Sequence, residues 1–364
     1  MVDYLIVGAG LYGATFARTM TDHGKTCLVI DKRSHIAGNV FSKTVDGIEV
    51  HQYGPHIFHT NSEMIWDHVR QFATFNDYRH KVLSDVNGDK YSFPINLKTL
   101  ESLWGEMSDA ELLKKFESVK SAHTHNETLE DWAIAEVGEE IYRKFIYGYT
   151  KKQWGTEPAN LPRSIITRIP VRNNRDDNYH AARFSGIPVD GYTSMVANML
   201  DGIRVILDAD YLENRSFWDS WARTVVYTGP VDEFFDYEHG EMKWRSLNFQ
   251  HRMLKTPQFQ DVAQVNHPDE HVPYTRSIEH KHFVPSTMGD TQHTVVTLEY
   301  PQKYIRGLEK YYPVCDDEQR SIYEAYRKII PSNFIFGGRL ATYRYYDMDQ
   351  VIASALSDAR NRLC

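Results

Sequence analysis

The sequence is poor in cysteine, in positive charge and in long apolar runs, and each shortage excludes a class of protein. Only three cysteines occur in 364 residues, Cys27, Cys315 and Cys364, so neither a disulfide framework nor a CxxC metal site is expected. Lys and Arg number 41 against 49 Asp and Glu, and the net charge of −8 disfavours nucleic acid and anionic membrane surfaces as partners. No run approaches the roughly 20 apolar residues that a membrane-spanning helix needs.

Metal-binding patterns and a targeting signal are lacking as well. The 17 His residues form no HxxxH or HExxH pair on a convincing helix. His280 and His282 alternate as strand residues do, so no metal site is expected. The chain passes from Met1 directly into an apolar strand, without the basic and apolar regions of a secretory signal. Together with the few cysteines, this predicts a cytoplasmic protein.

The first 40 residues have the pattern of a βαβ unit that binds a dinucleotide. A short apolar strand runs into GAGLYG at residues 8–13, which matches G-x-G-x-x-G and opens a predicted helix. In this motif Gly8 permits the tight turn, Gly10 lets the backbone approach a pyrophosphate, and Gly13 lets helix and strand pack closely. Asp31 lies 21 residues after Gly10 and ends the second predicted strand, where an acid accepts ribose hydroxyls.

The residues after Asp31 favour FAD over NAD and NADP. The stretch DKRSHIAGNVFS begins with the basic pair Lys32-Arg33 and turns at Gly38-Asn39, as in FAD proteins of the glutathione reductase type. The basic pair could instead bind the 2′-phosphate of NADP, but Asp31 would repel that group. Near the C-terminus, FGGR and a helix predicted from Met348 also favour FAD, because a helix N-terminus stabilises negative charge on a reduced flavin.

Changes in periodicity along the chain predict an α/β fold with two insertions. A discontinuous Rossmann-like FAD-binding domain is expected from residues 1–75, 186–240 and 330–364. Apolar residues at helical spacing predict an inserted helical bundle domain at 95–165, with a mobile substrate loop at about 151–183. Short β-type runs between Pro, Gly and Asp turns predict an inserted antiparallel β-sheet domain from 76–94 and 241–329.

Ten sequence blocks occur in the order expected of bacterial UDP-galactopyranose mutases, and they are distributed over nearly the whole chain. They are DYLIVGAGLYGA, YGPHIFHT, GYTKKQWG, ITRIPVR, GIPVDGY, VVYTGPVDEFFDY, VPYTRSIEHKHF, HTVVTLEYP, KYYPV and FGGRLATYRYYDMDQVI. Through these blocks the chain resembles that family far more specifically than through any single motif. One departure is Ala37, where the family usually has Gly, and it concerns only the local backbone conformation.

The resemblance implies an isomerase that interconverts UDP-galactopyranose and UDP-galactofuranose by ring contraction, without net redox change, for cell-wall or polysaccharide biosynthesis. In the family only the reduced flavin is active. Its N5 attacks the anomeric carbon and displaces UDP, and the resulting flavin-galactose adduct opens and recloses through the 4-hydroxyl. The resemblance thus implies FAD as cofactor, UDP-galactose as substrate, NADPH or NADH as electron donor, and a homodimer.

The resemblance also implies site residues, at positions where this sequence matches the family motifs. Arg168 and Arg276 match two essential arginines, whose charge would hold the diphosphate while the anomeric bond breaks. The implied substrate-binding residues are Phe145, Tyr149, Trp154, Tyr179, Asn266, Tyr311, Tyr345 and Asp347. The implied cofactor-binding residues are Gly8, Gly10, Leu11, Gly13, Asp31, Lys32, Gly38, Asn39, His56, His59, Gly338, Arg339 and Met348.

The aromatic residues of this set have distinct expected roles. Tyr149 would stack on the uracil, a contact of about 1–3 kcal/mol per base. Tyr179 and Tyr345 would donate hydroxyls to the diphosphate. Alternation puts only one residue of the pair Tyr311-Tyr312 into the site, and Tyr311 is preferred.

Two alternatives share the predicted fold. A flavin oxidase or dehydrogenase of the amine-oxidase type would lose its flavin colour on meeting its substrate and would have no need of UDP. The paired arginines and the stacking aromatics argue against it. A non-enzymatic nucleotide-fold protein, comparable to GDP-dissociation inhibitors, would carry no flavin.

Overall fold

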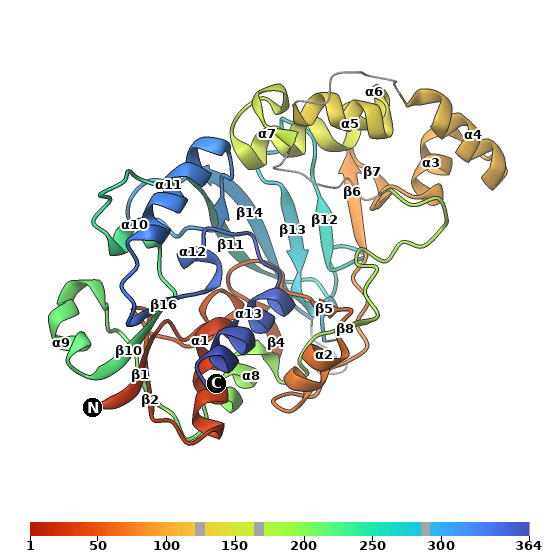
Figure 1. Cartoon of the computed structure of the whole chain (residues 1–364). Helices are drawn as coiled ribbons and strands as arrows, with labels where there is room; N and C mark the ends of the chain where they lie inside the picture. Colours follow the sequence, from red (N-terminus) through yellow and green to blue (C-terminus); the bar gives the residue numbers. More distant parts are fainter. Residues whose placement is uncertain (121–127, 164–170, 285–291, 364) are drawn as a thin grey trace. The chain divides into compact units, whose positions relative to one another are not determined.

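The chain divides into two compact units in the computed structural model, which describes residues 1–120, 128–163, 171–284 and 292–363 (Figure 1). Unit 1 comprises Met1–Tyr78, Ala182–Lys243 and Asp317–Cys364. Unit 2 comprises Arg79–Ala181 and Trp244–Asp316. The stretches assigned from the sequence to a helical domain and to a sheet domain lie together in unit 2, except that residues 76–78, 241–243 and 317–329 belong to unit 1.

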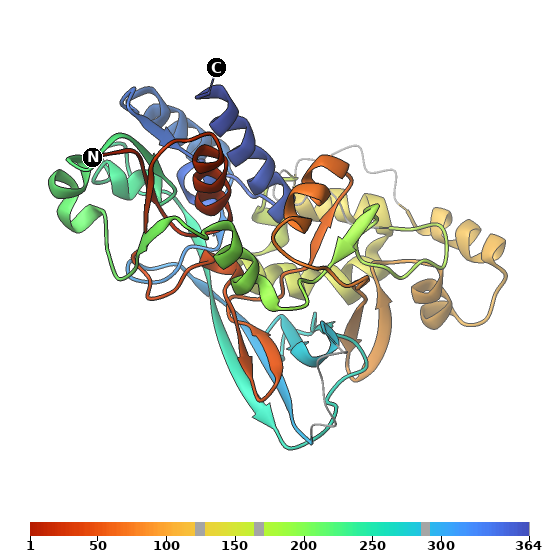
Figure 2. The ribbon, with the colours of Figure 1, turned by 90° about the horizontal axis from the view of Figure 1, so that it is seen from below.

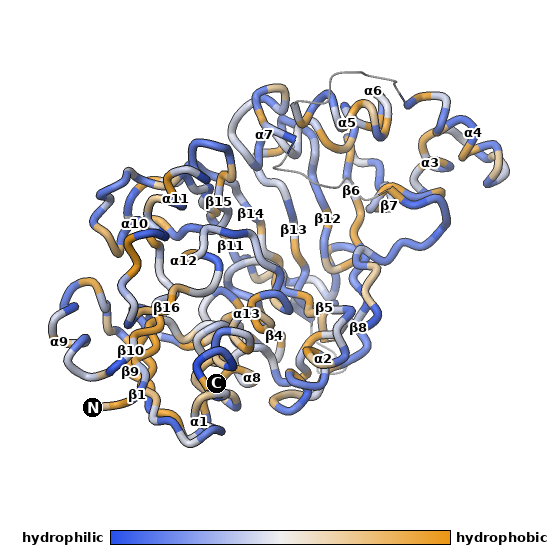
Figure 3. Tube along the Cα trace, in the orientation of Figure 1, coloured by the Kyte–Doolittle hydropathy of each residue, from blue (hydrophilic) through white to orange (hydrophobic). Residues whose placement is uncertain are grey.

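A parallel five-stranded sheet forms the centre of unit 1, in the strand order β16-β10-β1-β2-β9. These strands are Phe334–Phe336, Ala222–Tyr227, Val2–Val7, Cys27–Ile30 and Arg204–Ile206. Parallel strands are buried on both faces, which explains the apolar runs at residues 4–7 of β1 and 225–227 of β10 (Figure 3). The predicted Rossmann-like architecture is confirmed by this sheet and its crossover helices.

The first and the last helix of the chain pack together in unit 1. Helices α1 (Leu11–Asp22) and α13 (Met348–Asn361) lie side by side in both ribbon views (Figures 1 and 2). The remaining helices of the unit are α2 (Glu63–Arg70), α8 (Gly191–Met199), α9 (Arg215–Asp219), α10 (Val231–Phe234), α11 (Asp317–Lys328) and α12 (Gly338–Ala341). Two short antiparallel pairs complete it, β3 (Ser42–Val45) with β4 (Ile48–His51) and β5 (Phe58–Thr60) with β8 (Phe184–Gly186).

Unit 2 is built on a seven-stranded sheet in the order β15-β11-β14-β13-β12-β6-β7. These strands are Tyr312–Pro313, Trp244–Leu254, Thr294–Lys303, Arg276–Glu279, Gln264–Asn266, Val82–Val86 and Asp89–Phe93. Every pairing is antiparallel except that of β12 with β6, which joins the two chain segments of the unit. The predicted antiparallel sheet is therefore confirmed.

The helices of unit 2 pack around one hydrophobic cluster that contains Leu100, Leu112, Leu129 and Ile141. They are α3 (Leu97–Trp104), α4 (Asp109–Val119), α5 (Leu129–Val137), α6 (Glu139–Ile141), the π-helix η2 (Tyr142–Tyr147) and α7 (Gly148–Trp154). Gly138, with φ of +80°, ends α5, so the helical run expected there is broken into shorter pieces. Across the described part of the chain, no helix is both long and apolar enough to cross a membrane.

His280 and His282 do not lie in a strand, and the sequence expectation is wrong here. Strand β13 ends at Glu279, and His280–His282 form a 3₁₀ turn. The turn lets His282 Nε2 reach back to the buried Glu279 carboxylate at 3.2 Å, which also accepts a hydrogen bond of 2.6 Å from Thr294 Oγ1. Among the described residues, no group of three His, Cys, Asp or Glu side chains is arranged to hold a metal ion.

Candidate active site

The glycine-rich turn after β1 leaves a space that the protein itself does not fill. A Cβ on Gly13 would lie 1.9 Å from the carbonyl oxygen of Gly8, and Gly8 has φ of +114°, so the turn requires both glycines. Gly10 is different, because its φ is −80° and its Cβ would lie an ordinary 3.7 Å from the nearest atom, Cα of Gly38. The missing side chain at Gly10 is therefore explained by a ligand that approaches the backbone.

The N-terminus of α1 can hold the negative charge of such a ligand. Gly10 is its N-cap and has no side chain that could accept a hydrogen bond from the first turn. The free N–H groups at Leu11 and the following residues and the positive end of the helix dipole form a phosphate-binding site. A dinucleotide pyrophosphate fits this position.

Asp31 and its neighbours surround the same turn. Asp31 accepts hydrogen bonds from the backbone N–H of Ala9 (2.8 Å) and of Arg33 (2.9 Å), which tie the end of β2 to the glycine turn. Each carboxylate oxygen keeps a lone pair for a ribose hydroxyl. The Arg33 guanidinium donates to Asn39 Oδ1 at 3.1 Å, whereas Lys32 is exposed. The predicted cofactor residues on β2 and the next turn are thus brought together.

Ala37 adopts the conformation that glycine favours. Its φ is +73°, and its side chain is only 1% exposed. Its N–H donates to the Ala9 carbonyl oxygen at 2.9 Å, which holds the Gly38–Val40 turn against the glycine motif. Alanine therefore fits here at the cost of a strained backbone.

His56 is a neutral acceptor near the positive charge of Arg339. Burial and that charge lower the pKa of His56 to about 4. In the neutral ring Nδ1 donates to the Gly54 carbonyl oxygen at 2.9 Å, so Nε2 is the acceptor. The other predicted histidine, His59, lies in β5 within unit 1.

The FGGR segment is shaped by packing against α1. A Cβ on Gly337 would lie 1.9 Å from the ring of Tyr12, whose hydroxyl donates to Asp358 of α13 at 2.5 Å. Gly338 has φ of +80°. Gly337 is thus explained by contacts within the protein.

Two predicted residues meet just after this segment. The Arg339 guanidinium lies 4.9 Å from the ring centroid of Tyr345 and donates to the carbonyl oxygen of Tyr346 at 2.7 Å. Tyr345 is 58% exposed, so its ring and hydroxyl are accessible in unit 1.

Asp347 caps helix α13. Its side chain accepts a hydrogen bond from the first turn, and Gln350 Oε1 accepts one of 3.0 Å from the Asp347 N–H. The carboxylate therefore offsets the positive end of the helix that begins at Met348. That the same helix end stabilises a reduced flavin stays a prediction, and Asp347 would share this position with the cofactor.

In unit 2, paired side chains form a row across one face of the sheet. Residues directly opposite each other on neighbouring strands point to the same face. The register gives the order Phe249, Glu299, Arg276, Asn266, Ser84 and Tyr91, from β11 to β7. Two predicted residues, Arg276 and Asn266, are thus adjacent.

Arg276 is the cation of this row. Its Nη1 lies 3.4 Å from Glu299 Oε1, and its Cζ lies 5.8 Å from the ring centroid of Tyr149. Within the described residues, the buried Nε of Arg276 has no acceptor. Burial lowers the pKa of Arg276, but Tyr149, Glu299 and two further tyrosines together raise it by more, so the guanidinium stays charged. It can bind an anion.

Both tyrosines of the pair Tyr311-Tyr312 approach this row. Tyr311 packs edge to face on Phe249 with ring centroids 5.5 Å apart. Tyr312 lies opposite Arg245 on β11, and its phenol is among the groups that raise the pKa of Arg276. Tyr311 lies just before the first residue of β15 (Tyr312–Pro313). The alternation of side chains along a strand therefore does not decide which of the two faces the site.

Other predicted substrate residues lie around the same sheet. Phe145 packs edge to face on Tyr91 with centroids 5.1 Å apart and is buried in the hydrophobic cluster, against which Trp154 also packs. Tyr179 lies near Arg276 and donates its N–H to the His80 carbonyl oxygen at 2.6 Å. Arg168 lies outside the described residues, and the first residues of the expected substrate loop, 151–154, belong to α7.

Two cations that hold α7 in place were missed by sequence reasoning. Lys152 Nζ lies within hydrogen-bonding distance of four carbonyl oxygens of one loop, which share its three N–H donors: His267 (2.6 Å), Asp269 (2.8 Å), Val272 (2.8 Å) and Tyr274 (3.1 Å). Arg245 Nε donates to the Gln153 carbonyl oxygen at 2.8 Å. These bonds fix the helix that carries Tyr149. No sequence signal finds them, because the partners are backbone atoms far away in the chain.

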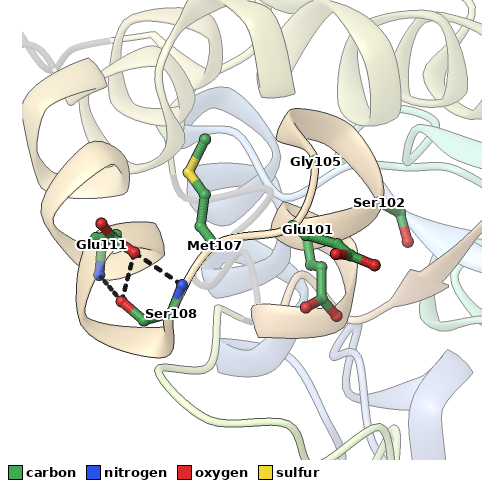
Figure 4. A pocket seen from close by; sticks show the side chains of 7 residues that line it. Glu101, Ser102, Gly105, Met107, Ser108 and Glu111 are labelled. Carbon is green, nitrogen blue, oxygen red and sulfur yellow. Dashed lines mark hydrogen bonds between the residues drawn. The ribbon is translucent and has the colours of Figure 1, made fainter.

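A depression beside the turn between α3 and α4 has a different character (Figure 4). It is lined by Glu101, Ser102, Gly105, Glu106, Met107, Ser108 and Glu111. The Glu111 carboxylate accepts hydrogen bonds from Ser108 N (2.9 Å) and Oγ (2.6 Å), and Glu101 pairs with Arg175. Its polar groups therefore cap and brace helices, and none of the predicted site residues lines it.

Comparisons with known proteins identify the family. The family model described as "UDP-galactopyranose mutase" matches residues 144–345, and that of an NAD(P)-binding Rossmann-like domain matches residues 6–72. A probable UDP-galactopyranose mutase of Klebsiella pneumoniae is 38% identical over 366 residues, 98% of this chain and 94% of the relative. A dTDP-fucopyranose mutase of Escherichia coli is 36% identical over 371 residues, 99% of this chain and 98% of the relative.

A solved structure agrees at the level of the fold. The crystal structure of a reduced UDP-galactopyranose mutase superposes with a TM-score of 0.80 at 15% identity, covering 100% of this chain and 96% of that one. The family resemblance expected from the sequence blocks is confirmed. The chain belongs to the UDP-galactopyranose mutase family and is a pyranose/furanose nucleotide-sugar mutase on a Rossmann-like FAD/NAD(P)-binding fold.

Proposed function

We propose that this protein is a flavin-dependent UDP-galactopyranose mutase that interconverts UDP-galactopyranose and UDP-galactofuranose. The observation that carries the proposal is the position of Arg276, which is next to Asn266 in the strand register and 5.8 Å from the ring centroid of Tyr149. Its guanidinium is charged, and its buried Nε has no acceptor among the described residues. A cation beside an aromatic face and an amide suits the diphosphate and base of a nucleotide sugar.

The chain's residues would act mainly by holding charge and position. Arg276 would stabilise the negative charge that develops on the departing diphosphate as the anomeric bond breaks. Tyr149 would stack on the pyrimidine, and the phenols of Tyr179 and Tyr312, which lie near Arg276, would donate hydrogen bonds to phosphate oxygens. Fixing α7 through Lys152 would keep the ring of Tyr149 in place.

Unit 1 has the features needed to hold FAD. The space at Gly10 and the open N-terminus of α1 fit the pyrophosphate, and Asp31 fits the adenosine ribose. When bound in the reduced form, FAD supplies the nucleophile for the anomeric carbon. We also propose NADPH or NADH as the source of electrons and a homodimer as the assembly, as the family resemblance implies.

A second candidate substrate is dTDP-fucopyranose, because the Escherichia coli relative of that name is almost as similar to this chain as the Klebsiella protein. Fucose lacks the 6-hydroxyl of galactose, and thymine adds a 5-methyl group to uracil. The same chemistry of ring contraction serves both sugars.

The test uses purified full-length protein reduced with dithionite. We expect a flavin absorption spectrum before reduction and, after it, conversion of UDP-galactofuranose to the pyranose form, followed by chromatography. The unreduced protein is the control and should be inactive. Faster turnover of the dTDP-fucose pair would reassign the substrate, and no turnover of either pair by reduced, flavin-loaded protein would overturn the proposal.

A further inference from the structure

The carboxamide of Asn266 is held in one orientation by its neighbour on the same strand. Gln264 and Asn266 are two residues apart on β12, so both side chains point to the same face of the sheet. Gln264 Nε2 donates to Asn266 Oδ1 at 2.9 Å. The two side chains are only 4% and 8% exposed, so water does not compete for this bond.

A third side chain fixes the orientation of Gln264. His80 Nε2 lies 3.4 Å from Gln264 Oε1 and is itself buried. An amide oxygen only accepts hydrogen bonds, so His80 must donate here. The three side chains form a directed chain of donors from His80 through Gln264 to Asn266.

This series of hydrogen bonds determines which group of the Asn266 carboxamide is left for a ligand. The oxygen of the carboxamide is engaged by Gln264, so the NH₂ group remains as the donor. Within the part of the chain that the structure describes, this NH₂ group donates to no acceptor. Asn266 therefore presents a hydrogen-bond donor, beside the cation Arg276 in the row of the unit 2 sheet.

The position of Asn266 in the row favours the base as its partner. Neighbouring strands are about 4.8 Å apart, so Asn266 stands about one strand spacing from Arg276. The aromatic pair Tyr91 and Phe145 lies further along the row, beyond Ser84. A nucleotide with its diphosphate at Arg276 and its base toward these rings would bring a base edge to Asn266.

We propose that Gln264 and His80 are positioning residues that make Asn266 select pyrimidines with a 4-keto group. Uracil and thymine carry an acceptor oxygen at C4, which the NH₂ group of Asn266 can bind. Cytosine carries a 4-amino donor, which would meet a second donor and leave both unsatisfied. This inference rests on the proposed function and narrows its substrates to uridine and thymidine nucleotides.

The experiment compares the binding of UDP, dTDP and CDP to the full-length protein by isothermal titration calorimetry. The wild type should bind UDP at least about tenfold more tightly than CDP. In Gln264→Glu the carboxylate can only accept, so the Asn266 amide turns its NH₂ group toward it and shows its oxygen to the base. The preference for UDP over CDP should then fall by at least about tenfold.

Two further variants separate the loss of the hydrogen bond from the effect of an added charge. Gln264→Met removes the bond without adding charge, and it should also reduce the preference for UDP by leaving the amide free to turn. Gln250→Glu makes the same chemical change on the opposite face of the same sheet, next to Phe249, and should keep the wild-type preference. Circular dichroism melting curves establish that each variant is folded.

The outcomes separate this inference from the proposed function. Equal binding of UDP and CDP by the wild type, or an unchanged preference in folded Gln264→Glu and Gln264→Met, would overturn the role of Gln264 and leave the mutase proposal standing. Absence of binding to both UDP and dTDP would instead count against the proposed function itself.

Discussion

Arg276 and Glu299 face each other on neighbouring strands of unit 2, and the Glu299 side chain is more deeply buried than that of Arg276. The Glu299 side chain is 1% exposed and that of Arg276 is 24% exposed, with 3.4 Å between Nη1 and Oε1. Burial raises the pKa of Glu299. A separation of 3.4 Å is long for a charge-assisted hydrogen bond, so the guanidinium keeps donors for a second anion.

Replacing Arg276 by Ala should abolish most turnover while the protein keeps its flavin. One lost charge-assisted hydrogen bond costs at least about 1.4 kcal/mol, so the rate should fall at least about tenfold. Because Arg276→Ala leaves Glu299 buried without its partner, the double variant with Glu299→Gln should recover stability but not activity. Arg252→Ala, an exposed arginine on β11, is the control. A loss below tenfold would contradict the role of Arg276 at the diphosphate.

Gly10→Ala and Gly13→Ala should have opposite effects on fold and cofactor binding. The Cβ added at Gly10 has room within the protein, so this variant should fold with an almost unchanged Tm but purify with little flavin. The Cβ added at Gly13 would lie 1.9 Å from a carbonyl oxygen, so that variant should be strongly destabilised. Absorption at the flavin band and thermal melts measure the two effects. Full flavin occupancy in Gly10→Ala would show that no ligand approaches there.

Ala37→Gly should stabilise the protein. The left-handed backbone at Ala37 costs a non-glycine residue roughly 1 kcal/mol, part of which is offset by the greater freedom of glycine in the unfolded chain. Ala17→Gly, in the interior of α1, is the matched control and should destabilise by about 1 kcal/mol. Chemical denaturation measures both free energies of unfolding. A lower stability of Ala37→Gly would mean that the methyl group contributes more by packing than it costs in strain.

Stability at low pH should depend on Glu279. Burial alone would raise the pKa of Glu279, but hydrogen bonds from His282, Thr294 and Gln260 lower it below its ordinary value of 4.5. A lowered folded-state pKa gives stability that is fully present above pH 4.5 and is lost as the pH falls through the folded value. Glu279→Gln should therefore lower the Tm at pH 7 and flatten its decline toward pH 3.

The stability that His282, the partner of Glu279, contributes has the opposite pH dependence. Burial lowers the pKa of His282, but the hydrogen bond to Glu279 raises it above 6.5, so its contribution is full below pH 6.5 and fades as the pH rises through the folded value. Glu106→Gln, at an exposed position, controls for the loss of one carboxylate. An acid-dependent Tm of the same shape in Glu279→Gln and the wild type would contradict both assignments.

Local patterns predicted the elements that depend on neighbouring residues. The turn at residues 8–13 and the helices that begin at Leu11 and Met348 were found because strand, glycine and helix signals follow one another in the sequence. The first two strands of the parallel sheet, β1 and β2, were found for the same reason, whereas β9 (Arg204–Ile206) was not predicted. Asp31 was recognised by its spacing from Gly10, and the structure places its carboxylate on the N–H of Ala9.

Features that depend on distant partners could not be predicted. The hydrogen bonds of Lys152 to the loop at 267–274 join a side chain to backbone oxygens more than 100 residues away in the sequence. The 3₁₀ turn at His280–His282 breaks the alternating pattern and brings His282 to the Glu279 carboxylate. The pairing of Arg276 with Asn266 and Glu299 required the strand register, which a single sequence does not reveal.

The interleaved order of the strands has a consequence for how the protein is made. The sheet of unit 1 needs β10 and β16, which end at Tyr227 and Phe336, and unit 2 needs strands on both sides of the 182–243 segment. At a synthesis rate of about 5–20 residues per second, neither sheet has all its strands until most of the chain has left the ribosome. Neither unit can close early, so nascent apolar strands such as β1 must be kept from aggregation, and chaperone dependence should be high during synthesis.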